Sequence, residues 1–212
     1  MKKICVIDYD AGNTMSVMNA LKFLGVEAEL TRDRQKLIAA DNCIFPGVGA
    51  YSDSLKKLDE YNLRDTVHEM IAGDVPFLGI CLGMQLLFDY SYENIGSEAD
   101  ETVKGLGILH GEIKSFKMNE GFSLKVPHMG WNSIKLVQKD SRLFKNIPDE
   151  SYVYFVHSFY LKAANRNEVS SVCNYGIDFD ASIERGNLFG CQFHPEKSGD
   201  TGLEILKNFC SL

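Results

Sequence analysis

The chain has 212 residues, a formal net charge of −7 and 45% hydrophobic residues. At this length a single domain can bury a large apolar core without disulfides or metals, so we expect one domain over residues 1–212. The acidic balance, with no block of lysine or arginine, argues against a nucleic-acid groove, whose affinity comes largely from phosphate neutralisation.

The sequence also carries no sign of a membrane segment or a secretory leader. No stretch approaches the roughly 18 consecutive apolar residues of a membrane helix, and the N-terminus reaches Asp8 too early for a signal-peptide core. We therefore expect a soluble, cytoplasmic protein. Its six cysteines form no CxxC pair and have no close histidine at metal-ligand spacing, so we expect no disulfide framework, no metal site and no cofactor.

Short apolar runs alternate with helical patterns in the first half of the chain. Unbroken apolar runs are typical of strands buried on both faces of a parallel sheet. They predict strands at residues 4–7, 26–30, 43–45 and 76–80, with helical patterns across 17–24 and 55–71. This order predicts βαβ units, that is, an α/β fold with a mostly parallel central sheet flanked by helices.

The second half has a different pattern, with many short β-rich runs between residues 108 and 193. These additional β-rich segments include residues 134–137, 152–160, 169–175 and 189–193. A closing helix is predicted to begin near Thr201, and the polar segment 93–104 is typical of a surface loop.

The pentapeptide Gly-Ile-Cys-Leu-Gly at residues 79–83 follows a predicted strand and precedes an apolar run. This pattern is typical of a nucleophile elbow, in which a sharp strand-to-helix turn exposes the reactive side chain. A helix N-terminus would favour the thiolate of Cys81, and the backbone N–H of Leu82 would point at an oxyanion. The alternative is one more buried thiol in a glycine-rich bend.

A second candidate group is the tripeptide His194-Pro195-Glu196, which follows the apolar run at residues 188–193. If the strand continued, residues two apart would project to one face, so the imidazole and the carboxylate would lie side by side. Such a carboxylate can orient the imidazole, which then serves as base and acid for Cys81. The alternative is an exposed turn with no role.

With these motifs placed, the whole chain resembles the class I glutamine amidotransferases. The motifs that carry the resemblance lie at residues 7–13, 46–49, 79–87, 127–132, 154–158 and 192–198. The resemblance implies a flavodoxin-like fold and a Cys-His-Glu triad of Cys81, His194 and Glu196 that hydrolyses glutamine to glutamate and ammonia. Asp10 departs from the glycine usual in the family, which bears on the loop there and not on the triad.

The resemblance also implies roles for residues around the triad. The backbone N–H of Val48, after reorientation, would join that of Leu82 in an oxyanion hole. Gly49, Gln85 and Ser158 match family positions that hold the glutamine.

The motifs at residues 127–132 and 154–158 are typical of glutaminase subunits that pass ammonia to a (βα)8-barrel cyclase in histidine biosynthesis. The resemblance therefore implies a heterodimer. Its interface would include Asn13, Pro127, His128, Met129, Trp131, Tyr154 and Lys197. Asn13 could instead be a plain helix N-cap, and Trp131 a core residue.

Two other functions remain open from the sequence. One is a paralogous glutaminase that supplies ammonia for amination of a surface-polysaccharide sugar, because the triad is common to both. The other is a thiol-stress protein on the same α/β fold, in which Cys81 senses oxidation without hydrolysing glutamine.

Overall fold

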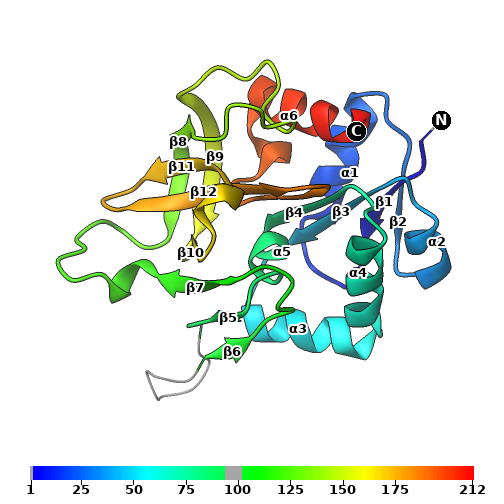
Figure 1. Ribbon diagram of the computed structural model, residues 1–212, viewed down its shortest axis with the longest axis horizontal. Coiled ribbons are helices and arrows are strands. Elements are labelled where there is room, and N and C mark those ends of the chain that lie inside the picture. Colours follow the sequence, from blue (N-terminus) through cyan, green and yellow to red (C-terminus); the bar gives the residue numbers. More distant parts are fainter. Residues whose placement is uncertain (1, 94–101) are drawn as a thin grey trace.

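The computed structural model describes residues 2–93 and 102–212. Its centre is a sheet in which the first five strands in spatial order are parallel to one another (Figure 1). These strands are, in that order, β2 (Ala28–Thr31), β1 (Ile4–Ile7), β3 (Asn42–Gly47), β4 (Phe77–Cys81) and β13 (Leu188–Cys191). The predicted α/β class with a mostly parallel sheet is confirmed.

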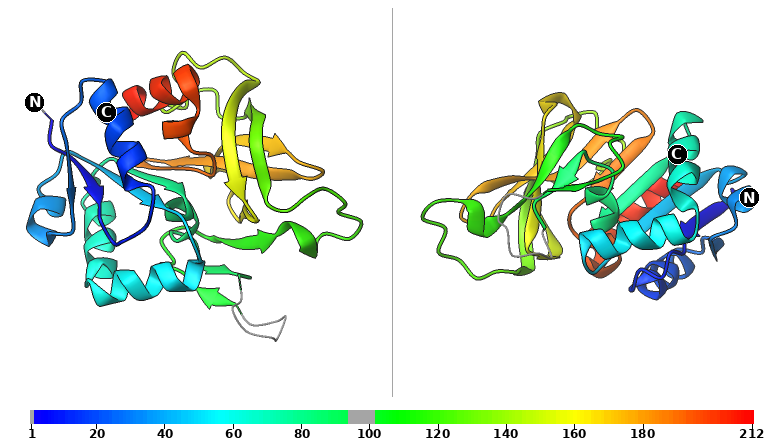
Figure 2. Two further views of the ribbon diagram at one scale, coloured as in Figure 1. Left: turned by 180° about the vertical axis from the view of Figure 1, so that it is seen from behind. Right: turned by 90° about the horizontal axis from the view of Figure 1, so that it is seen from below.

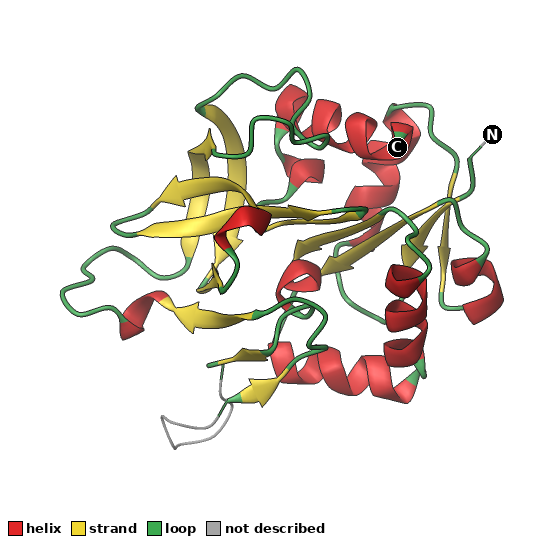
Figure 3. Ribbon diagram, viewed as in Figure 1, coloured by secondary structure: helices red, strands yellow, loops and turns green. Residues whose placement is uncertain are grey.

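Helices cover both faces of these strands because alternate strand residues point to opposite sides. On one face, α1 (Thr14–Phe23) and α6 (Gly199–Ser211) pack on a core that includes Val6 and Ile44. The other face packs on side chains that include Ile7 and Phe45. Its helices are α2 (Arg34–Ile38), α3 (Tyr51–Glu60), α4 (Leu63–Ala72) and α5 (Leu82–Gln85). Figure 3 shows these helices gathered around the parallel strands.

The sheet continues from β13 through mostly antiparallel strands, which lie to one side of the helix-covered part (Figure 2). In spatial order these are β12 (Asp178–Arg185), β10 (Phe159–Ala163), β7 (Gly111–Ser115), β5 (Tyr90–Ser91) and β6 (Val103–Lys104). A branch that begins with β11 pairing to β12 consists of β11 (Val169–Asn174), β8 (His128–Leu136) and β9 (Ser151–His157). Short 3₁₀ helices are η1 (Phe116–Met118), η2 (Arg166–Glu168) and η3 (Pro195–Lys197).

The structure differs from the expected elements at several places. The helix expected over residues 55–71 is two helices, because Asn62 has a left-handed φ of 54° and interrupts the chain between them. The run 152–160 is two strands that break at Ser158. Strand β12 was not expected because its polar residues hide the pattern, but two of its carboxylates, Asp180 and Glu184, are buried against arginines.

Two other sequence expectations concern a surface loop and a membrane helix. Of the predicted surface loop at 93–104, residues 94–101 lie outside the described residues, and residues 103–104 form β6. None of the helices in residues 2–93 and 102–212 is both long enough and apolar enough to cross a membrane.

Candidate active site

Cys81 lies at a sharp turn between β4 and α5. Its backbone has a φ of 53° and a ψ of −112°, a strained conformation of the kind that nucleophile elbows store. The turn is possible because its glycines lack Cβ atoms: a Cβ on Gly79 would lie 2.7 Å from Cα of Met84, and one on Gly83 only 1.9 Å from the carbonyl oxygen of Phe45. The strand, turn and helix expected around Cys81 are therefore present.

The end of β3 packs directly against this elbow. A Cβ on Gly47 would lie 2.6 Å from the backbone nitrogen of Gly83, and the hydroxyl of Tyr9 donates a 2.8 Å hydrogen bond to the carbonyl of Pro46. The chain is thus anchored as far as Gly47. Gly49, two residues further on, has a φ of 106°, a backbone conformation that disfavours any side chain.

A cavity of about 520 Å³ opens in front of Cys81, at the edge where the parallel strands β3, β4 and β13 all end. Ligands bind at this carboxyl edge in open α/β sheets. The cavity is lined by Asn13, Val48, Gly49, Cys81, Leu82, Gln85, Glu93, Pro127, Val156, His157, Ser158, Phe159 and Lys197. It brings together every oxyanion and substrate residue that the family resemblance implied, and adds four lining residues that the sequence did not single out.

His194 and Glu196 are next to Cys81, but they do not lie on a strand. Strand β13 ends at Cys191, and Pro195–Lys197 is a 3₁₀ helix, so the expected strand continuation is wrong. The 3₁₀ turn brings the two side chains together instead, with 2.8 Å between His194 Nδ1 and Glu196 Oε1. The backbone N–H of His194 donates to the carbonyl of Tyr154 at 2.9 Å, which fixes this turn to β9.

The surroundings of His194 favour its protonated form. Burial by itself would lower the pKa of His194, but the negative charges of the Cys81 thiolate and of Glu196 reverse that effect and raise the pKa. Nε2 of His194 is buried and has no hydrogen-bond partner within residues 2–93 and 102–212. This nitrogen is therefore free to exchange a proton with a group in front of it.

Asn13 has a role that the sequence did not reveal. It precedes α1 with a φ of 74°, and its side chain makes no capping hydrogen bond. Its Nδ2 instead donates to Glu196 Oε1 at 2.5 Å, the same oxygen that faces His194. Asn13 thus fixes the carboxylate that orients the imidazole.

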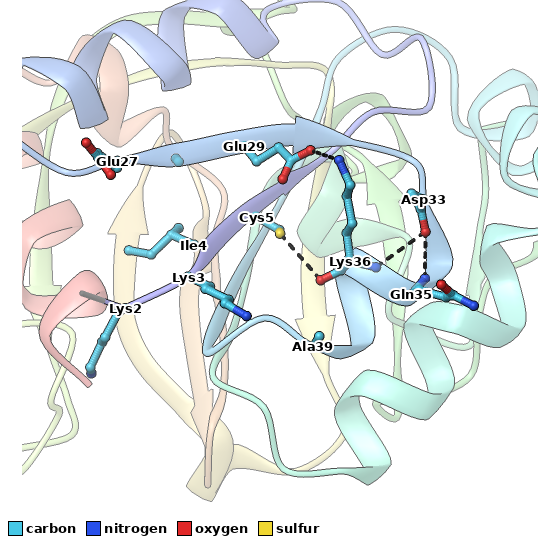
Figure 4. A pocket seen from close by; sticks show the side chains of 11 residues that line it. Lys2, Lys3, Ile4, Cys5, Glu27, Glu29, Asp33, Gln35, Lys36 and Ala39 are labelled. Carbon is cyan, nitrogen blue, oxygen red and sulfur yellow. Dashed lines mark hydrogen bonds and ion pairs between the residues drawn. The ribbon is translucent and has the colours of Figure 1, made fainter.

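A second hollow, of about 600 Å³, lies between β2 and α2 and is shown in Figure 4. It contains the thiol of Cys5, which donates to the carbonyl of Lys36 at 3.7 Å. Burial, with a contribution from Glu29, raises the pKa of Cys5 and keeps it a thiol. Its charged lining residues are of both signs and include no histidine, so no imidazole is placed there to accept the proton of the Cys5 thiol.

Comparison with known proteins agrees with this geometry. The family profile described as glutamine amidotransferase class-I matches residues 5–211. The imidazole glycerol phosphate synthase subunit HisH of Methanosarcina barkeri is 46% identical over 214 residues and covers 100% of both chains. The corresponding subunit of Moorella thermoacetica is 45% identical over 212 residues, which is 100% of this chain and 96% of that one.

The chain belongs to the class I glutamine amidotransferases. Within them it belongs to the family of HisH subunits, and it is a glutaminase. A solved glutamine amidotransferase shares the fold at a TM-score of 0.71 and 19% identity, covering 97% of this chain and 98% of that one. The glutaminase domain of Trypanosoma brucei CTPS with bound acivicin also shares the fold, at a TM-score of 0.67 and 16% identity. This match covers 100% of this chain and 94% of that one.

In this amidotransferase, two buried glutamines lie between the cavity and the elbow. Gln85 Nε2 donates to the carbonyl of Phe159 at 3.0 Å and to Gln192 Oε1 at 2.8 Å. Gln192 Nε2 in turn approaches Cys81 Sγ at 3.6 Å. In the sequence, Gln192 is marked only as a polar residue inside the apolar run at residues 188–193.

The amidotransferase also contains a buried pair of histidines next to the cavity. His157 Nδ1 donates to the carbonyl of Phe159 at 2.8 Å, so its Nε2 must accept from His128 Nδ1 at 2.9 Å. Burial lowers the pKa of His157 to about 3 and that of His128 to about 4, so both rings are neutral near pH 7.

The histidine pair predicts a loss of stability in mild acid. The cation of His157 is disfavoured only in the folded state, so the unfolded chain binds the proton first as pH falls below about 6.5. Stability is lost from there towards pH 3, by about 2 kcal/mol for this one group between pH 7 and pH 5. Urea unfolding of wild type and His157→Gln at both pH values checks this.

Glutamine at position 157 can donate and accept as a neutral imidazole does, but it does not titrate. The pH dependence of His157→Gln should therefore be weaker by about that 2 kcal/mol. His68→Gln, at an exposed histidine, is the control and should follow the wild type. Equal pH dependence in all three proteins would contradict the assignment.

Four of the residues expected at a partner interface lie on the β8–β9 ribbon, and they divide between its two faces. Met129 and Trp131 are 62% and 56% exposed on the outer face, where Trp131 contacts the ring of Tyr154 edge-on. His128 alternates with Met129 along β8 and is buried, stacked on Phe155, so it differs from the expected surface contact. Pro127 and Lys197 are exposed and line the cavity, which joins this face to the site.

No group of three or more histidine, cysteine, aspartate or glutamate residues is placed to hold a metal ion, within the part of the chain that the structure describes. All six cysteines are free and buried. Only Cys81 lies both on the elbow and on the cavity.

Proposed function

We propose that this chain is the glutaminase subunit of an imidazole glycerol phosphate synthase and that Cys81, His194 and Glu196 are its catalytic triad. The observation that carries the assignment is Cys81 at the strained elbow, facing a cavity large enough for a free amino acid, with the His194–Glu196 pair behind it. The full-length likeness to HisH subunits favours this function over amination of a polysaccharide sugar.

In the proposed reaction, the Cys81 thiolate attacks the side-chain carbonyl carbon of glutamine and forms a C–S bond. His194 gives its proton to the amide nitrogen, the C–N bond breaks, and ammonia leaves. His194 then takes a proton from water, whose hydroxide attacks the thioester; the C–S bond breaks, glutamate is released and the thiolate returns. Glu196 stabilises the imidazolium in both steps.

The negative oxygen of each tetrahedral intermediate needs hydrogen-bond donors. The backbone N–H of Leu82, at the start of α5, is one donor, and the N–H of Val48 becomes the second after reorientation. The positive φ of Gly49 and the open space around it, next to the tightly packed Gly47, support this proposal. One such donor typically contributes about 3 kcal/mol to transition-state stabilisation.

The names of the relatives describe a subunit of a synthase, so a second subunit receives the ammonia. We propose that this partner is a cyclase with a (βα)8-barrel fold and that it docks on the exposed face around Met129 and Trp131. A central exposed tryptophan with an aromatic neighbour is typical of an interface anchor. The cavity opens beside this face through Pro127 and Lys197, which gives ammonia a short route to the partner.

The test is glutamine hydrolysis measured with and without a histidine-pathway cyclase subunit and its ribonucleotide substrate. We expect glutamate release to rise with the partner and the cyclase product to form from glutamine as nitrogen source. If glutamine hydrolysis is unaffected and no product forms, the chain serves another acceptor, such as the sugar of the alternative.

Labelling by acivicin, which the Trypanosoma brucei glutaminase domain binds, distinguishes a glutaminase from a protein in which Cys81 only senses oxidation. We expect acivicin to label Cys81 and to stop hydrolysis, with glutamine protecting the thiol. Labelling by peroxide but not by acivicin would favour the thiol-stress function.

A further inference from the structure

We propose that Gln192 is a positioning residue of the glutaminase site: its side-chain amide holds Gln85 with its oxygen towards the cavity and supports the thiolate of Cys81. Gln192 lies directly after β13, two residues before His194. The inference rests on the proposed role of Cys81 as nucleophile.

Gln192 occupies a place where the fold by itself would favour an apolar side chain. Its relative exposure is 0%, and its neighbours Cys191 and Phe193 are equally buried. Burying an amide is unfavourable unless its polar atoms find partners. Both ends of the Gln192 amide find them within the site, through Gln85 Nε2 at 2.8 Å and Cys81 Sγ at 3.6 Å.

The partners of Gln85 fix the orientation of its own amide. A glutamine amide has two N–H donors and one oxygen, and both groups that Nε2 contacts, the Phe159 carbonyl and Gln192 Oε1, are acceptors. Turning the amide by 180° would place an oxygen against these two oxygens. Gln85 therefore offers Oε1 to the cavity that it lines, which is an acceptor suited to the ammonium group of an amino acid.

The second contact of Gln192 acts on the nucleophile itself. An N–H that points at sulfur stabilises the thiolate more than the thiol. One side chain thus couples substrate orientation to the charge state of Cys81. Its loss should change both KM and the pH dependence of thiol reactivity.

Gln192→Met is the main test, because methionine keeps the length of the side chain and removes both hydrogen-bond functions. With the partner subunit present, we expect kcat/KM for glutamine to fall about tenfold or more, with a rise in KM. The midpoint for alkylation of Cys81 by iodoacetamide, followed by mass spectrometry in the isolated chain, should move up by about half to one pH unit.

Gln192→Glu tests the contact with Gln85 separately from the contact with Cys81. It also provides a second test if the methionine variant fails to fold. The carboxylate still accepts from Gln85 Nε2, so KM should stay within about twofold of wild type. It places a negative charge beside Cys81, so the alkylation midpoint and the pH profile of kcat should both move to higher pH.

Asn208→Leu is the matched control, because Asn208 is also a buried amide, bonded through Nδ2 to the carbonyls of Leu143 and Lys145 and remote from the cavity. It should lower stability without changing KM or the alkylation midpoint. The proposal is overturned if the Gln192 variants behave as this control does. If Cys81→Ala retains hydrolysis, the assignment of the nucleophile fails instead, whatever the Gln192 variants show.

Discussion

Replacing Cys81 by alanine is expected to reduce glutamine hydrolysis by at least about 10,000-fold, because no other group on the cavity can form the thioester. Binding of the partner subunit should survive, since Cys81 is only 6% exposed and is not one of the exposed side chains proposed to contact the partner. The measurement is glutamate release with and without the partner subunit, together with a binding assay of the two subunits.

Cys210→Ala is the control for this experiment, because Cys210 is a buried thiol on α6. Burial raises the pKa of Cys210 to about 12, so it remains a thiol at neutral pH. We expect the Cys210 variant to retain activity. Hydrolysis that persists in Cys81→Ala, with ammonia and glutamate in equal amounts, would place the nucleophile elsewhere.

Replacing Gly83 by alanine is expected to destabilise the protein by about 3 kcal/mol or more and to reduce activity at least about 100-fold. The new Cβ would lie 1.9 Å from the carbonyl oxygen of Phe45 and 2.8 Å from its carbonyl carbon. Both atoms belong to the backbone of β3, so relief requires the elbow and the strand to separate. Urea unfolding and glutaminase assays measure the two effects.

Gly73→Ala is the matched control for Gly83→Ala. Gly73 has an ordinary φ of −78° at the end of α4, and its Cβ would lie 3.3 Å from the nearest atom, the carbonyl oxygen of Glu69. We expect its change in stability to stay within about 1 kcal/mol. Comparable stability and activity in the two variants would mean that the close contact between the elbow and β3 is not needed.

The parallel half of the fold could be predicted because buried strands appear in sequence as uninterrupted apolar runs. The errors have two causes: long-range partners, and single residues with an unusual backbone conformation. Strand β12 contains Asp180 and Glu184, whose burial makes sense only once Arg166 and Arg142 are placed beside them. The break at Asn62 depends on a single left-handed residue inside an otherwise helical pattern.

In the site, too, the local motif could be predicted from the sequence, whereas the contacts between distant residues could not. Cys81 and its glycines form a local motif, so the elbow could be predicted from residues 79–83. The contact of Asn13 with Glu196 joins residues 183 positions apart, and that of Gln192 with Cys81 joins residues 111 apart. Single-sequence patterns do not contain such pairings, because they depend on how the strands meet at the sheet edge.

The break between β9 and β10 at Ser158 leaves a backbone carbonyl available to side chains of the site. The carbonyl of Phe159, just after the break, accepts side-chain N–H groups from both Gln85 and His157, which uses both of its lone pairs. Ser158 itself lines the cavity. A sequence that made β9 and β10 one uninterrupted strand would gain regular pairing and lose this shared acceptor. The break after β9 therefore provides the acceptor that orients both Gln85 and His157 beside the cavity.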